Sequence, residues 1–193
     1  TQKVHEALVA AHDQVMFLAK MINDLGTLSR AERGAADETE TINLMELAST
    51  LHSEFAPRAA EKGLRFDLDV SAQIGVIKVS RLYLTELLQN FIINAIKYTP
   101  RGGVTLRMHR RNGAVQFAVI DTGIGIGKTD QKKIFQRFYR AEDYRTRETS
   151  GTGLGLYVAG KLAHKLGCTI SVKSRLNHGS TFSFELADPP TSA

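Results

Sequence analysis

Two asparagines and a lysine recur at helical spacing near the middle of the chain. The stretch QNFIINAIKYT places Asn90, Asn94 and Lys97 at positions i, i+4 and i+7, which share one face of a helix. Amide oxygens are suitable ligands for an Mg²⁺ ion that bridges phosphates, and an ammonium group offsets phosphate charge. The spacing therefore indicates a phosphate and Mg²⁺ site, with a solvent-facing polar stripe as the alternative.

Two glycine-rich segments carry a second kind of chemistry. DTGIGIG, residues 121–127, directly follows an alternating apolar segment, and its aspartate is placed to accept a hydrogen bond from a purine amino group. SGTGLGLYVAG, residues 150–160, opens a helix whose first N–H groups form an anion site. Neither segment has the pattern of a Rossmann site or a P-loop. An ordinary Asp–Gly turn and a flexible linker remain the alternatives.

A charged segment with aromatic side chains lies between these two motifs. Its possible apolar anchors are Phe135, Phe138 and Tyr139. Its arginines, which are candidate phosphate contacts or solvated surface charges, are Arg137, Arg140, Arg145 and Arg147. The whole region 122–152 is too long for an ordinary strand-to-helix connection, and such loops are usually functional lids or disordered.

Composition limits what kind of protein can carry these motifs. The chain has 193 residues, of which 42% are hydrophobic and 23% charged, as in a globular domain with a small appendage or two small domains. The single cysteine, Cys168, excludes a disulfide framework and a cysteine-based zinc site. The chain has no membrane-length apolar run and does not begin with the order of residues typical of a signal peptide. We therefore expect a cytoplasmic domain that makes no membrane contact of its own.

Periodicity and capping residues predict an α+β fold, a two-layer sandwich of helices on a mostly antiparallel sheet. Helices are expected at 1–33, 44–62, 80–98 and 154–166. Strands are expected at 41–43, 64–70, 76–79, 104–110, 114–121, 169–174 and 180–186. We divide the chain into an N-terminal helix (1–33), a linker (34–40), the main domain (41–187) and a tail (188–193).

The N-terminal helix carries an apolar seam typical of a coiled coil or helical bundle. Its members alternate spacings of four and three: Val4, Leu8, Ala11, Val15, Leu18, Ile22 and Leu25. A lone helix cannot bury such a seam. The seam therefore predicts a homodimer through this helix, with packing onto the chain's own domain as the alternative.

Taken in order, the motifs resemble the ATP-binding catalytic domain of sensor histidine kinases, which shares an ATP fold with type II topoisomerases, Hsp90-like chaperones and mismatch-repair ATPases. The resemblance spans residues 42–187. Residues 90–99 resemble the asparagine box, 121–125 the first glycine box, 135–140 the phenylalanine box and 151–156 the second glycine box, while 179–182 resemble the start of the final strand. It implies a Bergerat fold, with helices on one face of a mixed sheet and a long helix before it.

The resemblance also implies roles for individual residues. Asn94 would ligate Mg²⁺ with Asn90 beside it. Lys97 and Arg140 would contact phosphates, and Tyr98 would lie against adenine or ribose. Asp121 would bind the adenine amino group, assisted by Thr181 through a water. Gly123 and Gly125 would make space for the base, and residues 151–156 would hold the far end of the lid. The implied ATP-binding set is Asn90, Asn94, Lys97, Tyr98, Asp121, Gly123, Gly125, Ile126, Tyr139, Arg140, Gly151, Thr152, Gly153, Leu154, Gly155, Leu156 and Thr181.

The phosphoacceptor motif of this family, His-Glu-x-x-Thr/Asn-Pro, is absent from the sequence. His5-Glu6-Ala7-Leu8 lacks the Thr-Pro, and residues 21–34 resemble the end of the second dimerisation helix. We therefore expect a fragment that binds ATP and Mg²⁺ but does not phosphorylate itself, and we assign no catalytic residue. The resemblance implies a response regulator as the partner of the intact protein.

Three other functions remain open. A degenerate kinase would bind nucleotide or protein without phosphotransfer, and an anti-sigma-type serine kinase shares the fold, although the seam and linker argue against it. Nucleic-acid binding is suggested only by the net charge of +5. Residues 1–40 carry four basic and seven acidic side chains, whereas residues 41–193 carry 21 and 13. Because the excess lies in the ATP-binding part, a polyphosphate explains part of it and we expect no nucleic-acid partner.

Overall fold

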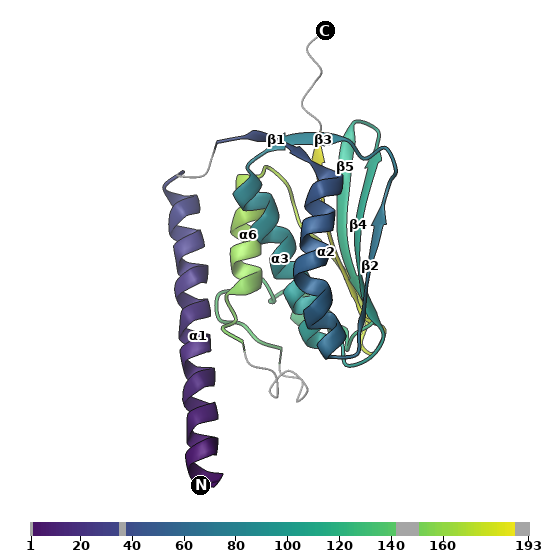
Figure 1. The fold of residues 1–193 in the computed structure, drawn as a ribbon. Helices are drawn as coiled ribbons and strands as arrows, with labels where there is room; N and C mark the ends of the chain where they lie inside the picture. The colour runs from purple at the N-terminus through teal and green to yellow at the C-terminus, as the bar shows by residue number, and fades with distance from the viewer. Residues whose placement is uncertain (1, 35–37, 142–150, 188–193) are drawn as a thin grey trace.

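A computed structural model describes residues 2–34, 38–141 and 151–187 (Figure 1). Its helices are α1 (Gln2–Glu32), α2 (Leu44–Glu61), α3 (Arg81–Tyr98), α4 (Lys128–Gln131) and α6 (Gly155–Lys165). Its strands are β1 (Glu40–Asn43), β2 (Arg65–Val70), β3 (Val76–Val79), β4 (Gly103–Arg111), β5 (Ala114–Asp121), β6 (Ser171–Ser174) and β7 (Ser180–Ala187).

The main sheet has five strands in the order β2-β4-β5-β7-β6. Only β2 and β4 pair in parallel, and the other neighbours are antiparallel. A tight turn at Asn112 and Gly113, both with positive φ, closes the β4–β5 hairpin, as the Asn-Gly pair predicts. Strands β1 and β3 form a separate antiparallel pair. The predicted mixed, mostly antiparallel sheet is confirmed.

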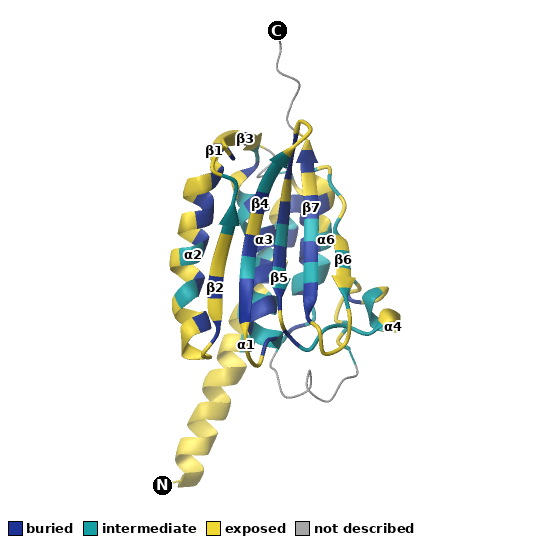
Figure 2. Ribbon diagram, turned by 90° about the vertical axis from the view of Figure 1, so that its right-hand side faces the viewer, coloured by how far each residue is buried: buried dark blue, intermediate teal, exposed yellow. Residues whose placement is uncertain are grey.

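Helices cover one face of the main sheet, and Figure 2 looks onto the other face. Along β4, Val104, Leu106 and Met108 are fully buried, whereas the intervening Arg107 is exposed. This alternation is that of a half-buried strand. The solvated face carries polar pairs, among them Arg107 with Asp69. The predicted two-layer sandwich is therefore confirmed.

Helix α3 is the central element of the helical layer. Its fully buried residues include Leu84, Leu87 and Phe91, and the Phe91 ring lies 5.2 Å from that of Phe182 on β7. Aromatic pairs at such distances pack favourably and fix the rotation of the helix. Because the apolar face of α3 is held against the sheet, its polar face is directed to one defined side.

Several predicted helix boundaries are confirmed by their capping contacts. The Asn43 side chain accepts from the N–H groups of Met45 (3.0 Å) and Glu46 (3.2 Å), and Ser80 Oγ accepts from the Tyr83 N–H at 3.3 Å. The strand expected at 169–174 begins only at Ser171, and the chain before it is bonded to the end of α6 as far as Cys168, whose N–H donates to the Ala163 carbonyl at 2.9 Å. Helix α4, inside the predicted lid, was not expected.

Helix α1 packs on its own domain, but not through the predicted seam. Val4, Leu18 and Ile22 are 62%, 54% and 70% exposed, whereas the neighbouring face buries Asp24, Thr27, Leu28 and Ala31. That face packs on α6. Residues 35–37 of the expected linker lie outside the described residues. In the ranges that the structure describes, no helix is long and apolar enough to cross a membrane.

Candidate functional site

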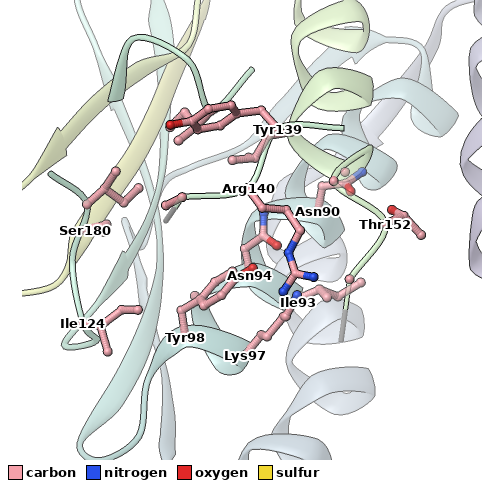
Figure 3. A pocket seen from close by; sticks show the side chains of 18 of the residues that line it. Asn90, Ile93, Asn94, Lys97, Tyr98, Ile124, Tyr139, Arg140, Thr152 and Ser180 are labelled. Atoms are coloured by element: carbon pink, nitrogen blue, oxygen red, sulfur yellow. The ribbon is translucent and has the colours of Figure 1, made fainter. Parts of the chain in front are cut away.

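A cavity of about 610 Å³ lies between α3, the segment after β5, residues 139–141 and the start of α6 (Figure 3). Most of the residues that the sequence singled out line it: Asn90, Asn94, Lys97, Tyr98, Asp121, Gly125, Ile126, Tyr139, Arg140, Gly151, Thr152, Gly153, Gly155 and Leu156. Gly123, Leu154 and Thr181 do not. Arg145 and Arg147 lie outside the described residues. Motifs far apart in sequence are thus brought to one hollow.

Asp121, at the end of β5, is a buried acceptor on the cavity wall. Its Oδ1 accepts from the Gly123 N–H at 2.8 Å and the Ser180 N–H at 3.2 Å. Burial raises its pKa to about 6, although the two N–H groups act in the opposite direction. Its Oδ2 accepts no hydrogen bond from any described residue. This oxygen is therefore available to a donor such as an adenine amino group.

Ser180, not Thr181, accompanies Asp121 in the cavity. In the antiparallel register Asp121 lies opposite Ser180, and Thr181 lies opposite Ile120. Side chains alternate between the two faces of a strand, so Ser180 and Phe182 line the cavity while Thr181 lies on the other face. The role that the resemblance implies for Thr181 stays a prediction, and the structure places the neighbouring Ser180 in the cavity instead.

The glycines of the two glycine boxes make room mainly for neighbouring backbone. A Cβ on Gly123 would lie 2.4 Å from the Tyr98 carbonyl oxygen, and one on Gly125 (φ +68) would lie 2.0 Å from that of Arg175. In the second box, a Cβ on Gly153 (φ +69) would lie 2.8 Å from the Phe138 carbonyl carbon. Only glycine allows these backbone segments of the cavity wall to approach one another so closely. The close backbone already requires glycine at positions 123 and 125, and their predicted role of making space for a base stays a prediction.

The polar face of α3 forms one side of the cavity. Asn90 Nδ2 donates to the Glu86 carbonyl at 2.9 Å, and its Oδ1 lies 3.0 Å from where a Cβ on Gly155 would sit. The Asn94 side chain makes no hydrogen bond to the described residues, so its amide oxygen is available. Within those residues no cluster of three His, Cys, Asp or Glu could hold a metal. A Mg²⁺ ion here would rely on amide, phosphate and water oxygens, a set that it accepts.

Cationic side chains lie near Asn94, at the end of the cavity formed by the last turns of α3. Lys97 Nζ lies 4.7 Å from the centre of the Tyr98 ring and 2.3 Å from where a Cβ on Gly151 would sit. Figure 3 shows Arg140 extending toward the side chains of Asn94 and Lys97. This end of the cavity is therefore suited to an anion, opposite in charge to the Asp121 end.

The segments flanking the cavity are held by hydrogen bonds. The Tyr139 hydroxyl donates to Asp130 Oδ1 at 2.6 Å, which ties the end of the lid to α4. In the second glycine box, the Leu154 N–H donates to Thr152 Oγ1 at 3.2 Å, and Leu154 is 1% exposed. The Leu154 side chain is therefore buried beneath the loop and does not line the cavity.

Several cavity residues were missed by the sequence analysis. From α1 they are Asp13, Met16, Phe17 and Lys20. From the main domain they include Ile93, Ile124, Ser180 and Phe182. Phe17 and Lys20 belong with the buried Asp24 and Leu28 to a second stripe at helical spacing beside the seam. That stripe was the available signal for the α1 contribution.

Residues 80–190 match the family model described as the histidine kinase-, DNA gyrase B- and HSP90-like ATPases. The chain belongs to this ATPase family. The matched segment begins at the cap of α3, includes all four boxes and ends beyond β7.

Two relatives of this ATPase domain are longer proteins named as histidine kinases. It is 36% identical to the circadian input-output histidine kinase CikA of Synechococcus elongatus, over 94% of this chain and 25% of that protein. It is 37% identical to the sensor histidine kinase RppB of Synechocystis sp., over 88% of this chain and 38% of that protein. The chain thus spans a quarter to two fifths of these relatives.

A solved structure shows the same architecture with a nucleotide analogue present. Full-length ShkA in complex with AMPPNP superposes with a TM-score of 0.80 at 29% identity, over 97% of this chain and 39% of that one. The recognised fold class is confirmed by this match. The chain is an ATP-binding domain of the histidine kinase type.

Proposed function

We propose that this ATPase domain transfers the γ-phosphoryl group of ATP to a histidine outside these residues, for onward transfer to a response-regulator aspartate. The observation that carries the proposal is the polarity of the cavity. A fixed carboxylate with one available oxygen lies at one end, and amides with two cations lie at the other. Adenosine triphosphate has the matching order of groups, with an amino-bearing base at one end and polyanionic phosphates at the other.

The predicted ATP-binding residues then have separate tasks. Asp121 Oδ2 accepts from the adenine amino group, and Tyr98 lies against the adenosine. Lys97 and Arg140 pair with phosphate oxygens, and the second glycine box packs beside them. Asn94, with Asn90 next to it, would hold Mg²⁺, which supplies charge neutralisation across the phosphates when bound. The chain's own contribution to catalysis is positioning and charge stabilisation.

In the proposed step, the bond between Pγ and the bridging oxygen breaks and a bond from Pγ to an imidazole nitrogen forms. ADP leaves with the electron pair of the broken bond. The imidazole nitrogen loses its proton to a base that also lies outside these residues. The missing His-Glu-x-x-Thr/Asn-Pro motif is the reason for placing both groups elsewhere.

Incubation with ATP labelled at the γ-phosphate tests this division of labour. We expect calorimetry to show ATP binding that weakens when Mg²⁺ is chelated, and we expect no phosphoprotein. Asn94→Ala should remove the Mg²⁺ dependence, while Thr105→Ala on the solvated sheet face serves as the matched control. An acid-labile, base-stable phosphoprotein formed by the chain alone would contradict the proposal.

The partners follow from the same proposal. The unburied seam of α1 would form the homodimer contact, and the phosphorylated histidine would be presented to a response regulator. The proposed location is the cytoplasm, where ATP is available, and no nucleic-acid partner is needed to account for the basic charge.

A further inference from the structure

A buried hydrogen bond joins α1 to the second glycine box. Thr152 Oγ1 donates to Asp24 Oδ2 at 3.2 Å, across 128 residues of sequence, and the two residues are 8% and 7% exposed. The other carboxylate oxygen, Oδ1, accepts from Lys20 Nζ at 3.2 Å. The same Thr152 hydroxyl accepts from the Leu154 N–H. Thr152 therefore connects the loop that borders the ATP cavity to a helix outside the main domain.

Burying a carboxylate at a helix interface is unfavourable in free energy unless hydrogen-bond donors or an opposite charge surround it. The rest of this contact consists of small or apolar residues, such as Leu28 and Ala31, which pack without needing a charge. Asp24 makes contacts that these residues cannot make. It holds the hydroxyl of a cavity-lining residue, while Lys20 offsets its charge.

We propose that Asp24 is a positioning residue for ATP binding. By fixing Thr152, it holds the loop 151–155 in the shape that receives the phosphates and makes ATP affinity depend on the docking of α1. The inference rests on the proposed function, since it takes ATP as the ligand of the cavity.

Two physical arguments give the direction of the effect. The loop contains three glycines, so ordering it on binding costs more conformational entropy than for other residues. A charge-assisted bond that orders it beforehand removes part of that cost and strengthens binding. Because coupling between two binding events is reciprocal, ATP must also favour the docked position of α1.

The test measures ATP affinity by calorimetry with Mg²⁺ on the 193-residue chain. Asp24→Ala and Thr152→Val should each weaken binding by about 10- to 150-fold, the range for a hydrogen bond to a charged group. The double variant should bind no more weakly than the weaker single variant, because both remove the same bond. Asp24→Asn, which keeps the size and an acceptor, should fall between wild type and Asp24→Ala.

Hydrogen exchange measures whether ATP protects the amides of α1, an effect that a purely structural role of Asp24 would not produce. In the wild type, ATP should slow amide exchange over residues 20–31, and this protection should be lost in Asp24→Ala. Glu6→Ala, which removes an exposed carboxylate from the same helix, is the control and should leave affinity unchanged.

The outcomes separate the two proposals. A wild type that does not bind ATP overturns the proposed function and this inference together. A wild type that binds ATP, with Asp24→Ala equal or tighter in affinity, overturns this inference alone. Multiplicative losses in the double variant, or a lower Tm with unchanged affinity, also overturn it.

Discussion

At the scale of single residues, Asp121 determines the character of the site. Two backbone N–H groups bind one carboxylate oxygen and leave the other facing the cavity. Burial opposes ionisation, so the pKa is raised to about 6. A carboxylate that must be ionised to accept cleanly from an amino group is thus kept near its titration point.

ATP affinity should therefore fall as the pH drops through 6. If only the ionised form binds, the Kd should rise about tenfold between pH 7.5 and pH 5. Calorimetry across this range checks the expectation, with Asp121→Asn as the comparison because its amide does not titrate. Parallel changes in both proteins would assign the dependence to ATP itself or to other groups.

The same pKa also predicts how stability responds to pH without ligand. The folded pKa lies above the ordinary value of 3.8, so the folded state binds the proton more tightly than the unfolded state. The contribution of Asp121 to the free energy of unfolding is fully present below pH 4 and is lost as the pH rises through 6. It amounts to about 3 kcal/mol. Urea unfolding at pH 4 to 7 should show this decline in the wild type and not in Asp121→Asn; equal slopes would contradict it.

At the scale of elements, the end of α3 is held by a side chain from the turn after α2. Lys62 Nζ donates to the carbonyls of Ile96 (2.7 Å), Lys97 (3.0 Å) and Thr99 (3.4 Å). These are carbonyls that a helix end leaves without partners, and a cation there also suits the helix dipole. Burial lowers the pKa of Lys62. The last turn of α3 carries Lys97 and Tyr98, so this cap also supports the site.

Lys62→Met should lower the free energy of unfolding by about 1 kcal/mol, since it keeps the apolar stem but loses the donors. It should also weaken ATP binding several-fold, because the last turn of α3 is less fixed. Thermal unfolding and calorimetry measure the two effects. Lys78→Met, at an exposed lysine on β3, should change neither, and a matching loss there would show that charge rather than capping is responsible.

The helices and strands that are marked by residues close together in sequence were predictable. Which face of each element would be buried against another was not. Asn43 and Ser80 mark helix starts because capping is a contact within a few residues. That Ser180, and not Thr181, shares the cavity with Asp121 could not be read from the sequence, because the face of a strand depends on its pairing with β5, a non-local fact. The buried face of α1 was missed for the same reason, since the apolar seam was the stronger local pattern and the partner helix α6 lies far along the chain.

At the scale of the whole molecule, α1 presents two faces with different uses. One contains Asp24 and Leu28 and packs on the ATPase domain, while the other, with Leu18 and Ile22, remains exposed. A long row of exposed apolar side chains on a helix is typical of an interaction surface, which is the role proposed for the seam. The seam and the ATP cavity therefore use different faces of α1, because the cavity is lined by α1 residues outside the seam, such as Phe17 and Lys20.

Substitution in the seam should therefore change association without changing ATP affinity. We expect the wild type to self-associate in sedimentation or light-scattering measurements, and Leu18→Glu with Ile22→Glu to shift it toward the monomer. The paired control Glu6→Gln should have no effect. A wild type that stays monomeric at high concentration would contradict the role given to the seam.

The order of strands in the main sheet has a consequence for aggregation. Because the sheet is open, β2 and β6 are its edges and leave backbone groups available to another chain. Charged side chains stand on both, with Arg65 and Asp67 exposed on β2 and Lys173 exposed on β6, which is only four residues long. Such edges discourage the addition of a further strand. Copies of this domain should therefore stay apart along their sheets even at high concentration.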